Sequence, residues 1–319
     1  MKKHKPKTAL LISGGGSTAE AIIKVCQSGQ LDIQPVVVIA SLSQAGGLDK
    51  AQRLGVPTCV AVIPTPSRVI LAPAGIQGVD SPRLGGGNDN MQVILATGAS
   101  QSRGSSGFSS LRRGMTKGEG NDNKSVFGFK LLEVLHSYQV ELVSQNGWMP
   151  LTPSAVIDEY QGRIINQHPG PLDPGRPDFG GKGMYGSRVT CARLAYLSLL
   201  NQTQTLKPDE FWTEATIHYI TEKYDQGQVL DTYRLNLGDV FPLSELSGLI
   251  NNQALLKKMT QRAQAVLILL EHKLVIRTLQ AFSRGKKTHH QPLKPLVPQK
   301  NISILQQAKE TAIKLFPKG

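Results

Sequence analysis

The first 63 residues alternate three apolar runs of strand length with two segments of helical spacing, and this alternation restricts the fold more than any other feature. The apolar runs are TALLI at 8–12, PVVVIA at 35–40 and TCVAVI at 58–63. Strands that alternate with helices are joined by crossover connections, which make neighbouring strands parallel and cover both faces of the sheet. We therefore predict an α/β fold with a doubly wound, mostly parallel sheet.

Further elements of the same kind are expected along the rest of the chain. Gly29 and Gly55 mark the ends of the first two helices, because glycine often terminates a helix. The expected helices are 19–27, 48–54, 126–138, 187–200, most of 243–282, and 302–316. The expected strands after the third are 140–144, 163–168, 211–220 and 228–237.

A stretch rich in Gly, Ser, Pro and Asn interrupts the pattern at about 64–123. A structureless loop of this length is uncommon inside a compact domain, so we interpret it as an irregular insertion. Two apolar runs inside it, at 68–72 and 92–96, are candidates for an added hairpin. We expect one domain at 8–282, interrupted by the insertion, and then a basic linker and a short terminal helix at 283–319.

The net charge of +13 would suggest a nucleic-acid-binding protein, but the charge is concentrated at the two ends of the chain. Residues 1–7 carry four lysines, and residues 283–319 carry eight Lys or Arg against one glutamate, so the remainder is nearly neutral. We expect both ends to be solvated tails that the chemistry does not require. Contact of these tails with a nucleic acid is the less favoured interpretation.

Cysteine usage and hydropathy indicate a cytoplasmic protein. Cys26, Cys59 and Cys191 are odd in number and follow no pattern, so reduced thiols are expected. No apolar run approaches membrane-spanning length, and the basic start MKKHKPK leads into a short strand and glycines, unlike a secretory signal. His289 and His290 have no partners at metal-ligand spacing, so we expect no metal site.

The strand predicted at 163–168 carries the main candidates for chemistry. It should end at His168, because Pro169 cannot donate to a sheet ladder. Asn166 and His168 are two apart and so point to the same side of the strand, at the edge of the sheet where ligands bind. Asp225, in the turn YDQG, is the best candidate for a carboxylate that completes the group. Alone, such residues at a strand end are more often structural.

An amide, an imidazole and a carboxylate together can carry out acyl transfer. A carboxamide can donate a hydrogen bond to an oxyanion as it forms. A histidine held by a carboxylate can move a proton between an amine and a leaving group, and the carboxylate is expected to raise the pKa of His168. No serine or cysteine is obviously placed as a nucleophile, so the nucleophile should come from a substrate.

The segment SGGGST at 13–18 lies between the first strand and the first helix. Its glycines let backbone amides approach a ligand, and the amino end of the helix offers unpaired N–H groups, so a phosphate site is predicted. Gly14, Gly16 and Ala19 also match a loose dinucleotide-binding pattern, but the second strand is followed by no acid that could hold a ribose. A phosphate monoester is therefore favoured over NAD.

Five segments support this interpretation further: LLISGGGSTAEAII, NGWMPLTP, GRIINQHPG, ATIHYITEKYDQGQVL and LLEHKLVI, in that order. Together they resemble the phosphoribosylglycinamide formyltransferase family of folate-dependent enzymes in purine biosynthesis. The resemblance covers about 8–63 and 124–282, and it implies a formyltransferase Rossmann-like fold. It also implies that 10-formyltetrahydrofolate is the formyl donor and that glycinamide ribonucleotide, a small phosphorylated amine, is the acceptor.

The resemblance implies roles for individual residues. Asn166 would polarise the formyl oxygen, His168 would donate a proton, and Asp225 would position His168 and raise its pKa. The implied acceptor-binding residues are Gly16, Ser17, Thr18, Lys124 and Glu271, the last of which would bind ribose hydroxyls. The implied folate-binding residues are Met149, Pro150, Leu151, Thr152, Asn166, Glu222, Lys223 and Tyr224. His218, inside a strand, is expected to be a packed or supporting histidine rather than a catalyst.

Two other interpretations stay open. One is another folate formyltransferase, acting on an amino-sugar nucleotide or on methionyl-tRNA. The basic tail fits the tRNA version, while the SGGGST loop and the short tail argue against it. The other is a non-catalytic nucleotide- or RNA-binding protein on the same fold, which would have no physical need for Asn166, His168 and Asp225 together.

Overall fold

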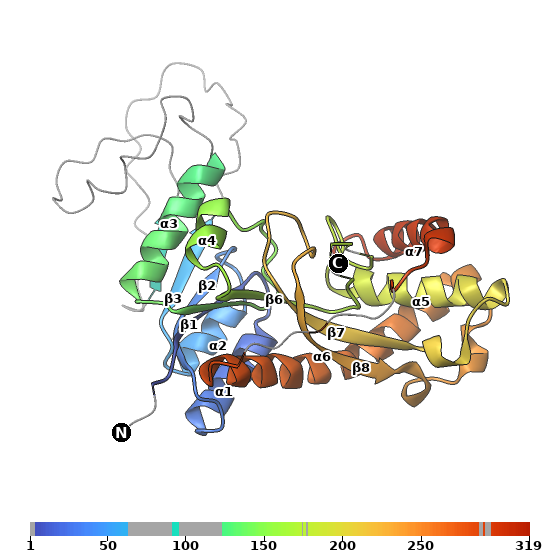
Figure 1. Ribbon diagram of the computed structural model, residues 1–319, viewed down its shortest axis with the longest axis horizontal. Coiled ribbons are helices and arrows are strands. Elements are labelled where there is room, and N and C mark those ends of the chain that lie inside the picture. The colour runs from blue at the N-terminus through green and yellow to red at the C-terminus, as the bar shows by residue number, and fades with distance from the viewer. Residues whose placement is uncertain are drawn as a thin grey trace, which may run out of the picture.

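The structure of the protein is a computed structural model that describes residues 4–62, 91–95, 123–173, 175–176, 178–286, 290 and 295–319. These residues form an eight-stranded sheet with helices on both faces (Figure 1). The strands are β1 (Lys7–Ile12), β2 (Gln34–Ala40), β3 (Thr58–Val62), β4 (Met91–Leu95), β5 (Leu142–Gln145), β6 (Ile164–His168), β7 (Trp212–Tyr219) and β8 (Val229–Asn236). The helices are α1 (Ser17–Gln27), α2 (Gly47–Arg53), α3 (Asn123–Ser137), α4 (Ser154–Glu159), α5 (Ser187–Gln202), α6 (Gln253–Ser283) and α7 (Ile302–Leu315).

The strand order in the sheet is β4-β3-β2-β1-β5-β6-β7-β8. The first six strands in that order are parallel to their neighbours, while β7 is antiparallel to β6 and β8 is antiparallel to β7. The prediction of a doubly wound, mostly parallel sheet is thus confirmed. The chain changes its direction across the sheet between β1 and β5, and such sheets bind ligands outside the carboxyl ends of the strands at this point.

The apolar runs are continuous because both faces of the parallel strands are buried. In β1, Leu10 and Ile12 belong to one buried cluster, whereas Ala9 and Leu11 belong to the other. Helices α3 and α4 contribute to the second cluster, and α1, α2, α5, α6 and α7 contribute to the first. Figure 1 shows α3 and α4 on one side of the sheet and α1, α2 and α6 on the opposite side.

The segment at 243–282 is mostly helical, as expected. Its first part consists of the short 3₁₀ turns Leu243–Leu246 and Leu249–Asn251, and α6 begins at Gln253. Gly248 adopts a left-handed conformation with φ +81°, which interrupts a helix. Asn252 then starts α6, because its side chain accepts a hydrogen bond from the amide of Leu255. Within the described ranges, no helix combines the length and the hydropathy needed to cross a lipid bilayer.

The predicted insertion contributes one described element to the sheet. Strand β4 pairs in parallel with β3 and forms one edge. The run at 68–72, which was expected to form the other half of a hairpin, lies outside the described residues.

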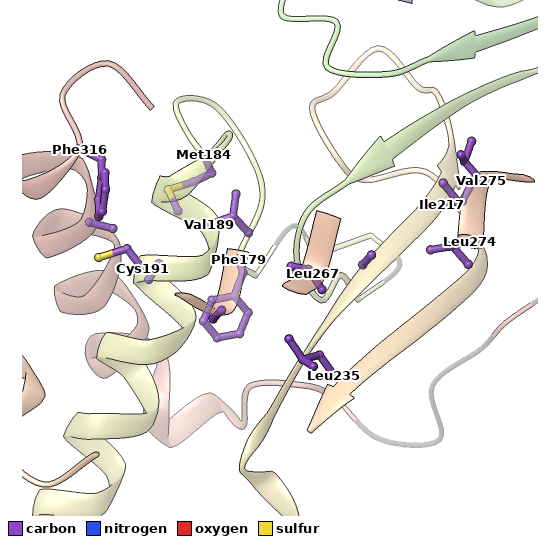
Figure 2. Close-up of a cluster of buried hydrophobic side chains, with 14 of the residues drawn as sticks. Phe179, Met184, Val189, Cys191, Ile217, Leu235, Leu267, Leu274, Val275 and Phe316 are labelled. Carbon is purple, nitrogen blue, oxygen red and sulfur yellow. The ribbon is translucent and has the colours of Figure 1, made fainter. Parts of the chain in front are cut away.

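The basic carboxyl-terminal segment packs against the domain in its described part, residues 295–319. Helix α7 lies beside α5 (Figure 1) and buries Leu305, Ala308 and Ala312 in the larger core cluster. Figure 2 shows Phe316, which follows α7, in one buried cluster with Met184 and Cys191. The prediction of a solvated tail is therefore wrong for this segment, because its small and apolar residues recur at helical spacing and match the surface of α5.

We predict that stability depends on the buried stripe of α6 and not on its exposed face. Leu274 is fully buried, so Leu274→Ala should lower the free energy of unfolding by about 2 to 5 kcal/mol. Leu269 lies on the same helix but is 58% exposed, and Leu269→Ala should change the free energy of unfolding by less than about 0.5 kcal/mol. Urea denaturation of both variants measures the difference, and equal losses would contradict this account of the core.

Candidate active site

A cavity of about 540 Å³ lies at the carboxyl ends of β1, β5 and β6, where the strand order reverses. Cavities of this size hold small molecules. The lining comes from residues 14–18, 145–152, 166–169 and 181–186, from parts of 218–225, and from Gln264, Ile268 and Glu271 of α6. The long loop before α5 thus contributes one wall, and the turn between β7 and β8 contributes another.

Most of the predicted site residues line this cavity. They are Gly16, Ser17, Thr18, Met149, Pro150, Leu151, Thr152, Asn166, His168, Lys223, Tyr224, Asp225 and Glu271. Glu222 does not line the cavity and is exposed, because the hydroxyl of Thr221 donates to the carbonyl of Lys223 in a tight turn that leaves the side chain between them in solvent. Lys124 lies in the first turn of α3, and its side chain is outside the described residues.

Strand register brings an amide next to an imidazole. Asn166 of β6 stands opposite His218 of β7, and Asn166 Nδ2 lies 3.0 Å from His218 Nε2. His218 Nδ1 lies 2.8 Å from the carbonyl oxygen of Tyr219. A carbonyl only accepts, so Nδ1 carries a hydrogen and donates it to Tyr219, while Nε2 contacts both Asn166 and Asp225. The second amide hydrogen of Asn166 remains for a ligand in the cavity.

Asp225 lies between two imidazoles. Its Oδ1 is 3.7 Å from His168 Nδ1 and 3.5 Å from His218 Nε2, and its Oδ2 accepts a 2.8 Å hydrogen bond from the amide of Gly181. Burial favours the neutral acid, but His168, His218 and the Gly181 amide together lower the pKa of Asp225 to about 2. Asp225 also adopts φ +55°, an unusual backbone conformation of the kind that clusters at functional sites.

His168 is buried, and burial dominates the shift of its pKa. Burial lowers the pKa of the imidazole, and the opposing effects of Asp225 and of the backbone of Phe179 do not restore it. Asp225 raises the pKa of His168, as expected, but the removal of the imidazolium from water outweighs the attraction of this one carboxylate, so the net shift is downward. His168 is thus neutral at neutral pH in the free protein, and Asp225 makes its protonation easier than burial alone would allow.

The glycine loop brings the amino end of α1 to the same cavity. Gly16 precedes the helix with φ +63°, and a Cβ atom at this position would lie 2.6 Å from the Cα atom of Gly47. The loop can therefore approach α2 closely only with glycine. The first N–H groups of α1, including those of Ser17 and Thr18, have no partner within the helix and can bind an anion.

Glu271 supplies a buried carboxyl group to the cavity wall. The side-chain amide of Gln167 donates a hydrogen bond to Glu271 Oε2. Burial raises the pKa of Glu271 to about 7, although the Gln167 hydrogen bond acts in the opposite direction. A carboxyl group in this setting is suited to accept hydrogen bonds from ligand hydroxyls, which would replace the lost contact with water.

Two residues of the site were missed in the sequence: Gly181 holds Asp225, and Gln167 holds Glu271. His218, expected to be a packed or supporting histidine, contacts both Asn166 and Asp225. The pair Gly180-Gly181 carries a signal in retrospect, since a Cβ atom on Gly180 would lie 2.8 Å from Asp225 Oδ2. Gln167 has no such signal, because its neighbours on the strand point to the other side.

The arrangement combines three features in one cavity: a hydrogen-bond donor for an oxyanion (Asn166), a neutral base beside a carboxylate (His168 and Asp225), and a helix end that can bind an anion. Such a set can stabilise a tetrahedral intermediate and move a proton between two nitrogens. In the part of the chain that the structure describes, no group of three or more His, Cys, Asp or Glu side chains is placed to hold a metal ion.

Comparison with known proteins extends this interpretation. Phosphoribosylglycinamide formyltransferase, chloroplastic, from Arabidopsis thaliana is 26% identical over 230 residues, which cover 71% of this chain and 55% of that protein. The protein of the same name from Vigna unguiculata is 25% identical over 227 residues, 71% of this chain and 50% of its own length. The chain thus spans about half the length of these curated relatives.

Solved structures show the same fold. Glycinamide ribonucleotide transformylase 1 from Symbiobacterium toebii matches with a TM-score of 0.52 and 19% identity over 91% of this chain and 96% of its own. Phosphoribosylglycinamide formyltransferase from Brucella melitensis matches with a TM-score of 0.51 and 19% identity. The match covers 90% of this chain and 100% of that protein. A family model described as formyl transferase matches residues 6–185, which is more than half of the sequence and includes the glycine loop, Asn166 and His168. The chain therefore belongs to the formyl transferase family.

Proposed function

We propose that this protein transfers the formyl group of 10-formyltetrahydrofolate to the amine of glycinamide ribonucleotide, a step of purine biosynthesis. One observation carries the proposal: Asn166, His168 and Asp225 meet in the same cavity as the amino end of α1. The two plant relatives named phosphoribosylglycinamide formyltransferase support this choice of acceptor.

The acceptor is held at both of its ends. Its phosphate binds to the backbone amides of Ser17 and Thr18, where the helix dipole favours a negative charge. Its ribose hydroxyls donate to Glu271, and Gln167 assists, because Gln167 Oε1 is buried without a partner among the described residues. Lys124 remains a further candidate for the phosphate. The primary amine then lies between these contacts and the catalytic residues.

The folate lies along the other wall of the cavity. The backbone and side chains of 149–152 line it, together with Lys223 and Tyr224. Met149 and Tyr224 are 40% and 38% exposed, so their apolar surfaces are available to an aromatic ring system. The amide of Met149 donates to the hydroxyl of Ser13, which ties this wall to the glycine loop.

The reaction begins when the amine of the acceptor attacks the formyl carbon. A C–N bond forms, and the carbonyl oxygen becomes an oxyanion that accepts a hydrogen bond from Asn166 Nδ2. Neutral His168 takes the proton that the attacking nitrogen must lose, and the nearby Asp225 carboxylate stabilises the imidazolium. His168 then returns the proton to the departing folate nitrogen as the second C–N bond breaks, so His168 ends as it began.

The cysteines support transfer without an acyl-enzyme intermediate. Burial raises the pKa of Cys26 to about 12 and those of Cys59 and Cys191 to about 11, and none of these thiols lines the cavity. Protonated buried thiols are poor nucleophiles. We also propose a cytoplasmic setting, where free thiols persist.

The acceptor is tested by offering 10-formyltetrahydrofolate with glycinamide ribonucleotide, with an amino-sugar nucleotide, with methionyl-tRNA, or alone. Release of tetrahydrofolate together with a formylated product is expected only with glycinamide ribonucleotide. Comparable turnover with another acceptor would reassign the substrate, and folate release without any acceptor would indicate hydrolysis instead of transfer.

The role of Asp225 is tested with Asp225→Asn. Asparagine keeps the shape, tolerates a positive φ and can still accept from Gly181, but it cannot stabilise an imidazolium. We expect kcat/KM to fall by about 10² to 10⁴ with an unchanged circular dichroism spectrum. Asp239→Asn, which neutralises an exposed carboxylate after β8, is the matched control and should keep full activity.

The variant Glu271→Gln tests the buried state of Glu271 through folding stability, which can be measured without an activity assay. A carboxyl whose pKa rises from 4.5 to about 7 on folding binds more protons in the folded state, so its ionisation destabilises the fold as the pH rises from about 4.5 to 7. The variant should therefore be more stable than the wild type at pH 8, by up to about 3 kcal/mol, and nearly equal at pH 4.5. It should also raise the KM for the acceptor. A stability difference that does not depend on pH would contradict this assignment.

A further inference from the structure

The loop at residues 178–181 contacts both titratable members of the proposed catalytic group. The amide of Gly181 donates to Asp225 Oδ2 at 2.8 Å, and the backbone of Phe179 lies close enough to His168 to raise its pKa. Gly180 lies against Asp225 so closely that any larger side chain would displace it. The position of this backbone therefore sets the position of Asp225.

Lys309 of α7 holds the same four residues from the other side. Its ammonium donates to the carbonyl of Asp178 at 2.6 Å and to the carbonyl of Gly180 at 2.8 Å. Along the chain, the carbonyls of Asp178 and Gly180 accept from Lys309. The backbone of the residue after each of them faces His168 or Asp225. A charged donor makes stronger hydrogen bonds than a neutral one, so Lys309 anchors this loop to α7.

Two arginines, Arg176 and Arg188, also join this region to the terminal segment. Arg176 donates to the carbonyl of Val297 at 2.9 Å. Arg188, at the start of α5, donates to the carbonyls of Gly183, Phe316 and Pro317 at 2.6 to 2.8 Å. Figure 1 shows the end of the chain beside this loop.

We propose that α7 supports the active site from outside the cavity and that Lys309 is a positioning residue, which acts through Gly181 to hold Asp225 beside His168. The loop needs such support because it contains several glycines, whose backbone loses the most conformational entropy when it is ordered. The proposal extends the predicted boundary of the catalytic domain, which ended at residue 282, to include the terminal helix.

The catalytic part of this inference depends on the proposed function, so its test has one arm that does not require formyl transfer. In that arm, amide hydrogen exchange of Gly181 is measured by NMR in the wild type, in Lys309→Met and in Lys314→Met. Lys314 lies on the same helix and is exposed, so its replacement removes the same charge without any loop contact. We expect exchange at Gly181 to accelerate about tenfold or more in Lys309→Met and to stay unchanged in Lys314→Met.

Protection of the Leu10 amide in β1 reports whether each variant is folded. If Lys309→Met loses this protection, Lys309→Gln, which keeps a polar end, replaces it in the same comparison. Equal exchange at Gly181 in the wild type and in a folded Lys309 variant would overturn the proposal, whatever reaction the protein catalyses.

The second arm is a double-mutant cycle on kcat/KM. Lys309→Met should lower kcat/KM about tenfold in the wild type and less than about twofold in Asp225→Asn, because the residue that Lys309 positions has already lost its charge. A merely structural role would lower activity by the same factor in both backgrounds and would refute positioning. Absence of transfer by the wild type would refute the proposed function, while the exchange arm would still decide the role of Lys309.

Discussion

An ionised carboxylate that leaves water loses several kcal/mol of hydration unless other groups replace that contact, and Asp225 is in this situation. The replacements come from three places in the sequence: His168 in β6, His218 in β7 and the amide of Gly181 in the loop before α5. Because each contributes only part of the compensation, the site exists only when all three segments are in place. The buried charge therefore links catalysis to the packing of elements around it.

The antiparallel strands β7 and β8 at one end of the sheet bring these segments together. Antiparallel pairing sets Asn166 opposite His218, and the turn after β7 returns Asp225 to the same edge. A shift of one residue in this register would turn the side chains to the opposite face. The amino end of α1 lines the same cavity, so the proposed phosphate-binding and proton-transfer groups open on one space.

The terminal segment shows how a glycine-rich wall can be kept in one conformation. Phe179 and Met184 anchor the segment 178–186 in the core, and backbone carbonyls between and beside them accept hydrogen bonds from Lys309 and Arg188. These cations are half-buried or buried and contact carbonyls directly, which accounts for two of the basic residues near the site without any nucleic acid. Lys309 thus contributes both to the positive charge of the tail and to its packing against the domain.

The sequence alone determined the fold class and the side-by-side placement of Asn166 and His168, because strand periodicity, proline and glycine act through local geometry. Asp225 was a candidate, and only the tertiary structure brings it to them. Asn166 and His168 must share one side of a strand whatever surrounds them. Local pattern could not reveal that α7 packs on α5, that Lys309 and Gly181 hold the loop, or that burial lowers the pKa of His168. These features depend on distances between segments far apart in the chain and on the exclusion of water, which only the folded structure decides.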